Sequence, residues 1–278
     1  MIKIKTIHDY EYLPFVDDRL LFRGQSKECY RLLPGAYRSN DDPKNKVLDF
    51  TPKIEINSIE RFIYHLLERG YSFKPKENLQ EIFNSFSPIF PGDDILPYMA
   101  LAQHYASDSE FHWLRTSLLD VSYSLDIATY FAVNKDFECN GKIYVFNKDQ
   151  VNEKPPYKVF ELYSGMQNEA RMVVQNGAFI YRQQIYDNYS EMPRYNDFTP
   201  FDDNIVLDTI IIPRLLKEDL KEHLRRKLFD NLILPKLLLG KMTLSMPSFG
   251  NRSNEELLKI HKPAIDMAEN ASDIHSCY

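Results

Sequence analysis

The sequence predicts an α+β protein in which strands and helices are mixed along one chain. Apolar residues at helical spacing over 56–67 indicate an amphipathic helix, whereas the β-branched and aromatic run 142–146 indicates a strand. Strands and helices do not alternate strictly, which favours α+β over a doubly wound parallel sheet. At 278 residues, 44% of them hydrophobic, the chain is long enough to bury a sizeable core.

The helices are expected in four places. The stripe at 56–67 forms the first, with Gly70 as the residue that ends it, and 98–105 forms the second just after Pro97. Ser124 is expected to cap the third helix, because its hydroxyl can accept from a backbone N–H of the first turn. The fourth, 217–228, carries leucine at every fourth position.

The strands are expected from apolar and β-branched runs bounded by turn residues. They cover residues 20–23, 142–146, 172–174, 178–181 and 205–212. The first should end at Arg23, and Asn176-Gly177 predicts a hairpin between the third and the fourth. Residues 1–245 are interpreted as one domain and residues 246–278 as a polar tail.

Composition and missing motifs argue against several classes of function. The net charge of −6 argues against sequence-blind nucleic-acid binding, which requires a basic surface. No apolar run of about 18 residues is present, so no membrane-spanning helix is expected. The 3 cysteines show no paired spacing, which fits a reducing, cytoplasmic setting, and neither Cys nor His shows metal-ligand spacing. Serine-hydrolase, P-loop and Rossmann motifs are also absent.

Polar residues near the expected element ends are candidates for a ligand site. Arg23-Gly24 suits an anionic ligand, because a guanidinium offers a bidentate fork and Gly permits close approach; the alternative is a surface turn with Arg23 paired to a carboxylate. Gln103 and His104 lie off the apolar stripe of their helix, facing a pocket or serving the structure. Asp120, if buried, needs a partner such as Arg23 or His104.

Ordered motifs then resemble the FRG domain. They are Phe22-Arg-Gly-Gln25, Ala100–Tyr105, Leu118-Leu-Asp120, Ile127–Ala132, and Asn168 and Arg171 before Gln175-Asn-Gly177 and Phe179. The resemblance covers about residues 20–240 and implies a bacterial or phage-associated protein. One segment departs from the family: the usual Leu-Pro-Thr-Arg-Leu-Leu-Asp-Trp-Thr becomes Leu114–Ser122, which loses Pro, Arg and Trp, and an insertion at 108–111 precedes it.

The chain is also similar, more weakly, to arginine-directed ADP-ribosyltransferases. These carry an Arg-Gly at a first strand, a Ser motif before an A-x-x-F/Y-A helix, and a Gln- or Glu-x-Glu ahead of a Gly. The corresponding residues here are Arg23-Gly24, then Ser122 and Ser124 before Ala128–Ala132, then Gln167-Asn-Glu169 before Gly177. This similarity implies a mixed sheet core with surrounding helices and NAD as the substrate, without a metal.

The same similarity implies roles for individual residues. Glu169 would stabilise an oxocarbenium-like transition state, and Gln167 would orient an acceptor. Arg23 would hold the diphosphate or ribose of NAD, and the backbone of Gly24 would meet the nicotinamide amide. Ser122 or Ser124 would form the floor of the pocket. The remaining residues expected to line the NAD site are Gln25, Gln103, His104 and Asp120.

Three functions follow from these patterns. The leading hypothesis is transfer of ADP-ribose from NAD to a macromolecular acceptor, or hydrolysis of NAD. The second is a binding module in which Arg23, Gln103, His104 and Asp120 recognise a ligand without catalysis. The third is a sensor or interaction subunit of a bacterial conflict system, with the tail after Met246 docking a partner protein. A pocket-facing Glu169 would favour the enzyme.

Overall fold

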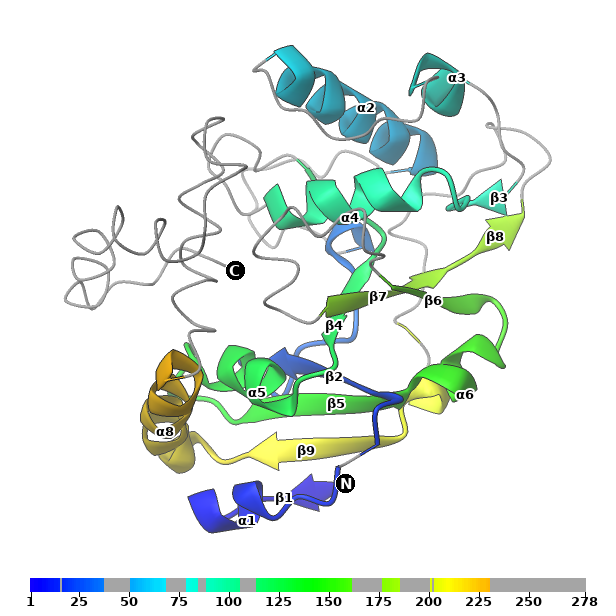
Figure 1. Ribbon diagram of the computed structural model, residues 1–278. Coiled ribbons are helices and arrows are strands. Elements are labelled where there is room, and N and C mark those ends of the chain that lie inside the picture. The colour runs from blue at the N-terminus through cyan, green and yellow to red at the C-terminus, as the bar shows by residue number, and fades with distance from the viewer. Residues whose placement is uncertain are drawn as a thin grey trace.

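A seven-stranded sheet organises the chain (Figure 1). The computed structural model describes residues 1–15, 17–37, 51–68, 79–84, 89–105, 114–161, 177–185, 201 and 203–230. Within these, the strand order is β1-β9-β5-β2-β4-β7-β6, and every neighbouring pair is antiparallel except β1 with β9. The strands are β1 (Ile2–Lys3), β2 (Leu20–Gln25), β4 (Leu119–Ser122), β5 (Gly141–Asn147), β6 (Tyr157–Glu161), β7 (Gly177–Arg182) and β9 (Asp208–Ile212). The predicted α+β class is confirmed.

A second, two-stranded sheet pairs β3 (Ile89–Phe90) with β8 (Gln184–Ile185). Seven helices and three short 3-10 turns complete the described part of the chain. They are α1 (Ile7–Glu11), α2 (Pro52–Glu68), α3 (Leu79–Asn84), α4 (Leu96–Tyr105), α5 (Leu125–Val133), α6 (Lys148–Asn152), α8 (Lys217–Asp230), η1 (Gly35–Tyr37), η6 (Asp203–Ile205) and η7 (Arg214–Leu216). In Figure 1, α2, α3 and α4 lie at one end of the molecule and α5 and α8 at the other.

One face of the large sheet is covered by α5 and α8. Side chains alternate between the faces of a strand, so Leu20 and Phe22 of β2 share this face with Ile143 and Val145 of β5. They pack with the buried leucines of α8, which recur every four residues: Leu220, Leu224 and Leu228. The apolar side chains on one face of α8 therefore pack in one core with the side chains that alternate along β2 and β5.

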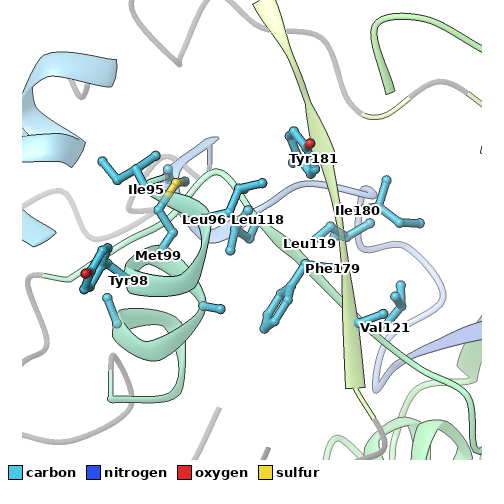
Figure 2. Close-up of a cluster of buried hydrophobic side chains, with 14 of the residues drawn as sticks. Ile95, Leu96, Tyr98, Met99, Leu118, Leu119, Val121, Phe179, Ile180 and Tyr181 are labelled. Atoms are coloured by element: carbon cyan, nitrogen blue, oxygen red, sulfur yellow. The ribbon is translucent and has the colours of Figure 1, made fainter. Parts of the chain in front are cut away.

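A second core lies where α4 approaches β4 and β7 (Figure 2). Leu96 and Met99 of α4 are buried with Leu118 and with Phe179 of β7, all at 1% exposure or less. Helix α2 adds a stripe of buried side chains to the same core, namely Ile59, Phe62, Ile63 and Leu66. This core fixes α4 over the part of the sheet where the candidate site lies.

The four expected helices are confirmed, with small shifts of their ends. The first begins at Pro52 and the second at Leu96, so that Pro97 lies inside the first turn, where its missing N–H costs nothing. Ser124 is the N-cap of α5, and its Oγ accepts from the backbone N–H of Ile127 at 3.3 Å. Gly70 and the tail 246–278 lie outside the described residues.

Two strand predictions are wrong in detail. Arg23 lies inside β2, which runs on to Gln25 between β5 and β4, instead of ending the strand. Both edges of β7 are taken by β4 and β6, so β7 is not half of an Asn176-Gly177 hairpin; 172–174 lies outside the described residues. The Asn-Gly turn signal therefore predicted that residues 172–174 would pair with β7, but β7 pairs with β4 and β6 instead. The last expected strand is confirmed but begins later, at Asp208; η6 ends at Ile205, and residues 206–207 lie between the two elements.

Candidate functional site

Arg23 and Asp120 lie in contact, although 97 residues separate them. The guanidinium Nη1 donates to the backbone carbonyl oxygen of Asp120 at 2.6 Å. Strand β2 pairs with β4 at Phe22 and Ser122, and beyond that pair the Arg23 side chain bridges the two strands. Arg23 therefore lies beside Asp120, as expected, but it binds the backbone of Asp120 and not its carboxylate. That the two residues share a ligand site stays a prediction.

The carboxylate of Asp120 is bound by Gln103 of α4. Gln103 Nε2 donates to Asp120 Oδ2 at 3.0 Å, and the hydroxyl of Thr116 donates to Gln103 Oε1. Thr116 is fully buried, whereas Gln103 and Asp120 are partly buried. A row of three side chains therefore joins α4 to the strand that carries Asp120, and both ends of the Gln103 amide are satisfied within it.

Glu55 of α2 carries a buried carboxyl group that sequence reasoning missed. It is 0% exposed, and its Oε1 accepts from the backbone N–H of Ser117 at 2.6 Å and from the hydroxyl of Ser117 at 3.1 Å. Ser117 stands where the FRG motif usually has Arg. The sequence did hold a signal for this contact: Glu55 lies among the apolar positions of an amphipathic helix. A carboxyl group buried there requires hydrogen-bond donors.

Gln25 contributes a buried acceptor near Arg23. Its Nε2 donates to the carbonyl oxygen of Arg31 at 3.3 Å, while its Oε1 is buried and has no hydrogen-bond donor in the part of the chain that the structure describes. Gln25 lies two residues after Arg23 on β2, so both side chains point to the same face of the sheet, together with Tyr144 opposite Arg23. A ligand with a donor group would satisfy this oxygen.

Ser122 lies at the centre of a row that crosses three strands. Its direct partners are Phe22 of β2 on one side and Gly177 of β7 on the other. Ser122 Oγ accepts from the backbone N–H of Ser124 at 2.9 Å, so the two serines shape the turn into α5. Because Ser122 shares a face with Phe22, its side chain points away from the face that carries Arg23. The structure therefore does not bring Ser122 and Ser124 to the guanidinium of Arg23.

The sheet and α5 approach each other very closely at Gly24. A Cβ on Gly24 would lie 1.7 Å from the carbonyl oxygen of Ala128 and 2.9 Å from the backbone nitrogen of Ala132. Only glycine fits there, whatever ligand the neighbouring Arg23 holds. The sequence pattern suggested close approach at this residue, and the structure shows that the helix backbone is what approaches it.

Lys217 is a second buried charge that the sequence did not reveal. It is fully buried at the start of α8, and its Nζ donates to the carbonyl oxygens of Ser26, Lys135 and Asp136 at 2.6–2.9 Å. Burial lowers the pKa of Lys217 to about 8, against the opposing charge of Asp136. The ammonium ties α8 to the residues that follow Gln25 and to those that follow α5.

The remaining predicted residues are placed only in part. His104 belongs to α4, but its side chain is not described, and Gln167 and Glu169 lie outside the described residues. Among the described residues, no three His, Cys, Asp or Glu side chains are close enough to hold a metal ion. Within the same residues no helix is long and apolar enough to cross a membrane.

Two of the family motifs come together at Gly24. One is Phe22-Arg-Gly-Gln25 in the central strand β2, and the other is Ile127–Ala132 in α5, which packs on that strand. Residues 18–140 match the FRG domain. The matched range includes Glu55, Gln103, Thr116 and Asp120, so the contacts that α2 and α4 make with residues 116–120 lie within it. No curated protein and no solved structure matches the chain.

Proposed function

We propose that this FRG-domain protein binds NAD and transfers its ADP-ribose to a macromolecular acceptor or to water. The observation that carries the proposal is the row Phe22–Ser122–Gly177 across β2, β4 and β7. This row joins three segments whose order along the chain is that of the motifs of arginine-directed ADP-ribosyltransferases. Arg23 follows Phe22, α5 follows Ser122, and Gly177 follows Glu169 by eight residues. Segments spread over more than 150 residues therefore meet on three adjacent strands.

The face of the sheet that carries Arg23 offers suitable chemistry. Arg23 is a cation beside the buried oxygen of Gln25, and the two side chains point the same way. A guanidinium is suited to the diphosphate of NAD, and an acceptor oxygen is suited to a ribose hydroxyl or a carboxamide N–H. Glu169 is proposed as the carboxylate that stabilises the oxocarbenium-like transition state, with Gln167 orienting the acceptor.

Release of nicotinamide from NAD by the purified protein tests this function. We expect release that follows the amount of protein and is lost in Glu169→Gln. Glu153→Gln is the matched control, because Glu153 is exposed at the end of α6, and it should release nicotinamide at the wild-type rate. A wild-type protein that neither binds nor consumes NAD rules the proposal out.

A non-catalytic binding module is the second candidate. It is favoured by the way the motif residues satisfy one another: Gln103 bonds to both Asp120 and Thr116, and Ser122 and Ser124 serve the turn into α5. The side chain of Ser122 also lies on the face opposite Arg23. For this candidate we expect NAD or another anionic ligand to bind, with Arg23 required, and no nicotinamide to be released.

A further inference from the structure

A pocket of about 320 Å³ lies between α2, α3, the small β3–β8 sheet and the start of α4, away from the contact between Arg23 and Asp120. Ile95 stands at its edge and Gln103 lies eight residues further along α4, which corresponds to about 12 Å along the helix axis. The volume is at the lower end of what small-ligand sites occupy and is enough for one long side chain. The lining residues are Ile56, Ile82, Ile89, Phe90, Gly92, Asp93, Asp94, Ile95 and Gln183.

The lining of this pocket is of two kinds. Four isoleucines and Phe90 provide apolar walls, whereas the exposed Asp93 and Asp94, in the turn before α4, provide carboxylates. Among the described residues, no cationic side chain lines the pocket. Burial and, to a lesser extent, the charge of Asp93 raise the pKa of Tyr181 on the neighbouring β7 to about 12. The pocket therefore combines apolar walls with one negatively charged side.

An apolar surface continues from the pocket onto the small sheet. Ile89, which lines the pocket, is 40% exposed and pairs directly with Ile185, which is 77% exposed. Such a pair of exposed β-branched residues is suited to the apolar residues that flank a docked side chain in a polypeptide. A free small cation would leave this surface uncovered.

We propose that this pocket binds an arginine side chain of a partner polypeptide, with the guanidinium at Asp93 and Asp94 and the residues beside the arginine on Ile89 and Ile185. The methylene stem of arginine matches apolar walls, and its planar, weakly hydrated head stacks on aromatic rings such as Phe90 and pairs with carboxylates. The site is independent of NAD chemistry, so either proposal can fail while the other holds.

Methyl NMR of the full chain tests the pocket, because isoleucine methyls lie inside it and elsewhere. The probe is acetyl-Leu-Arg-Leu-amide, and its matched control replaces arginine with citrulline, which keeps the shape and removes the charge. We expect the arginine peptide to shift the methyl signals of Ile56, Ile82 and Ile95 with a Kd of about 1 mM or tighter. Ile210 and Ile212 lie in the core under α8 and should not shift.

Three variants complete the test. Asp93→Asn with Asp94→Asn should weaken binding at least about tenfold, and Ile185→Ser should weaken it severalfold, since Ile185 is mostly exposed and its loss leaves the fold intact. Asp219→Asn on α8 removes an exposed carboxylate elsewhere and should bind like wild type. Equal binding of the citrulline peptide, wild-type binding by the double Asn variant, or no shift of the pocket methyls overturns the proposal.

Discussion

The carbonyl oxygen of Ala128 on α5 lies where the side chain of residue 24 would begin, only 1.7 Å from the position of a Cβ on Gly24. The atom is backbone inside a helix, so a rotamer change cannot relieve the clash. The glycine of the first FRG motif is thus a requirement of helix–sheet packing.

We expect Gly24→Ala to lower the free energy of unfolding by about 3 kcal/mol or more, because α5 must move away from β2 and open the core beneath it. Thermal and urea unfolding measure this loss. Gly35→Ala is the control: the nearest atom to its Cβ, Thr116 O, lies at an ordinary 3.8 Å, so stability should change little. A folded Gly24→Ala protein with wild-type stability would contradict the close packing.

Glu55 gives a second expectation about stability. Glu55→Ala leaves the buried N–H of Ser117 without its acceptor and should cost about 3 kcal/mol. Glu55→Gln keeps an acceptor oxygen and should cost less, and Ser117→Ala, which removes only the hydroxyl bond, should cost about 1 kcal/mol. Glu68→Ala, at the exposed end of the same helix, is the control and should stay within about 0.5 kcal/mol. Chemical denaturation ranks the four variants.

Lys217 should make stability depend on pH in a defined direction. Its folded pKa of about 8 lies below the ordinary 10.5, so between these values the unfolded chain holds a proton that the folded protein has released. The contribution of Lys217 to the free energy of unfolding therefore rises as the pH increases above about 8. Below about pH 8 both states hold the proton, and this pH-dependent contribution is absent. We expect the difference in unfolding free energy between wild type and Lys217→Met to change over pH 7.5–9.5 in favour of wild type.

The control for Lys217 is Lys158→Met, since Lys158 is exposed on β6. Its difference from wild type should stay constant over the same pH range. A constant difference for Lys217→Met as well would mean that the three carbonyl oxygens hold the ammonium protonated throughout.

The NAD proposal separates a rate defect from an affinity defect. We expect Glu169→Gln to bind NAD nearly as wild type does while turnover falls about 100-fold, because the carboxylate acts on the transition state. Arg23→Ala should mainly weaken NAD binding, since a guanidinium fork holds phosphate in the ground state and the transition state alike. Calorimetry and nicotinamide release measure the two effects.

Arg23→Ala needs a separate check of folding. Its guanidinium also donates to the carbonyl oxygen of Asp120, so the variant should lose some thermal stability. Binding is therefore compared at a temperature where both proteins are folded. Wild-type affinity for NAD in folded Arg23→Ala would remove this residue from the proposed site.

Local patterns in the sequence predicted those helices and strands well whose regularly spaced apolar residues all pack into the same core. The leucines of α8 and the cap of Ser124 are examples, since their signals lie within a few residues. The partner of β7 was missed because pairing with β4 and β6 involves residues far away in the chain. The same limit applies to polar partners: Glu55 with Ser117, and Lys217 with Ser26, are separated by 62 and 191 residues.

Within the candidate site, motif order correctly placed Arg23 beside Asp120, but it did not indicate which atom of Asp120 would be bound. Strand register decides that point, because a shift of one residue moves every side chain to the opposite face. This is also why Ser122, which lies directly opposite Phe22 and not opposite Arg23, points to the other side of the sheet.

The pairing of β1 with β9 has a consequence for how the chain is made. Ile2 lies beside Ile210, and β5 also depends on β9, so contact order in this sheet is high. During synthesis, the edge of β5 that pairs with β9 stays unpaired until residue 212, the last of β9, has left the ribosomal exit tunnel. An unpaired apolar strand edge is prone to aggregate. Slower synthesis lengthens that wait, whereas chaperones that shield strand edges should raise the yield of folded protein.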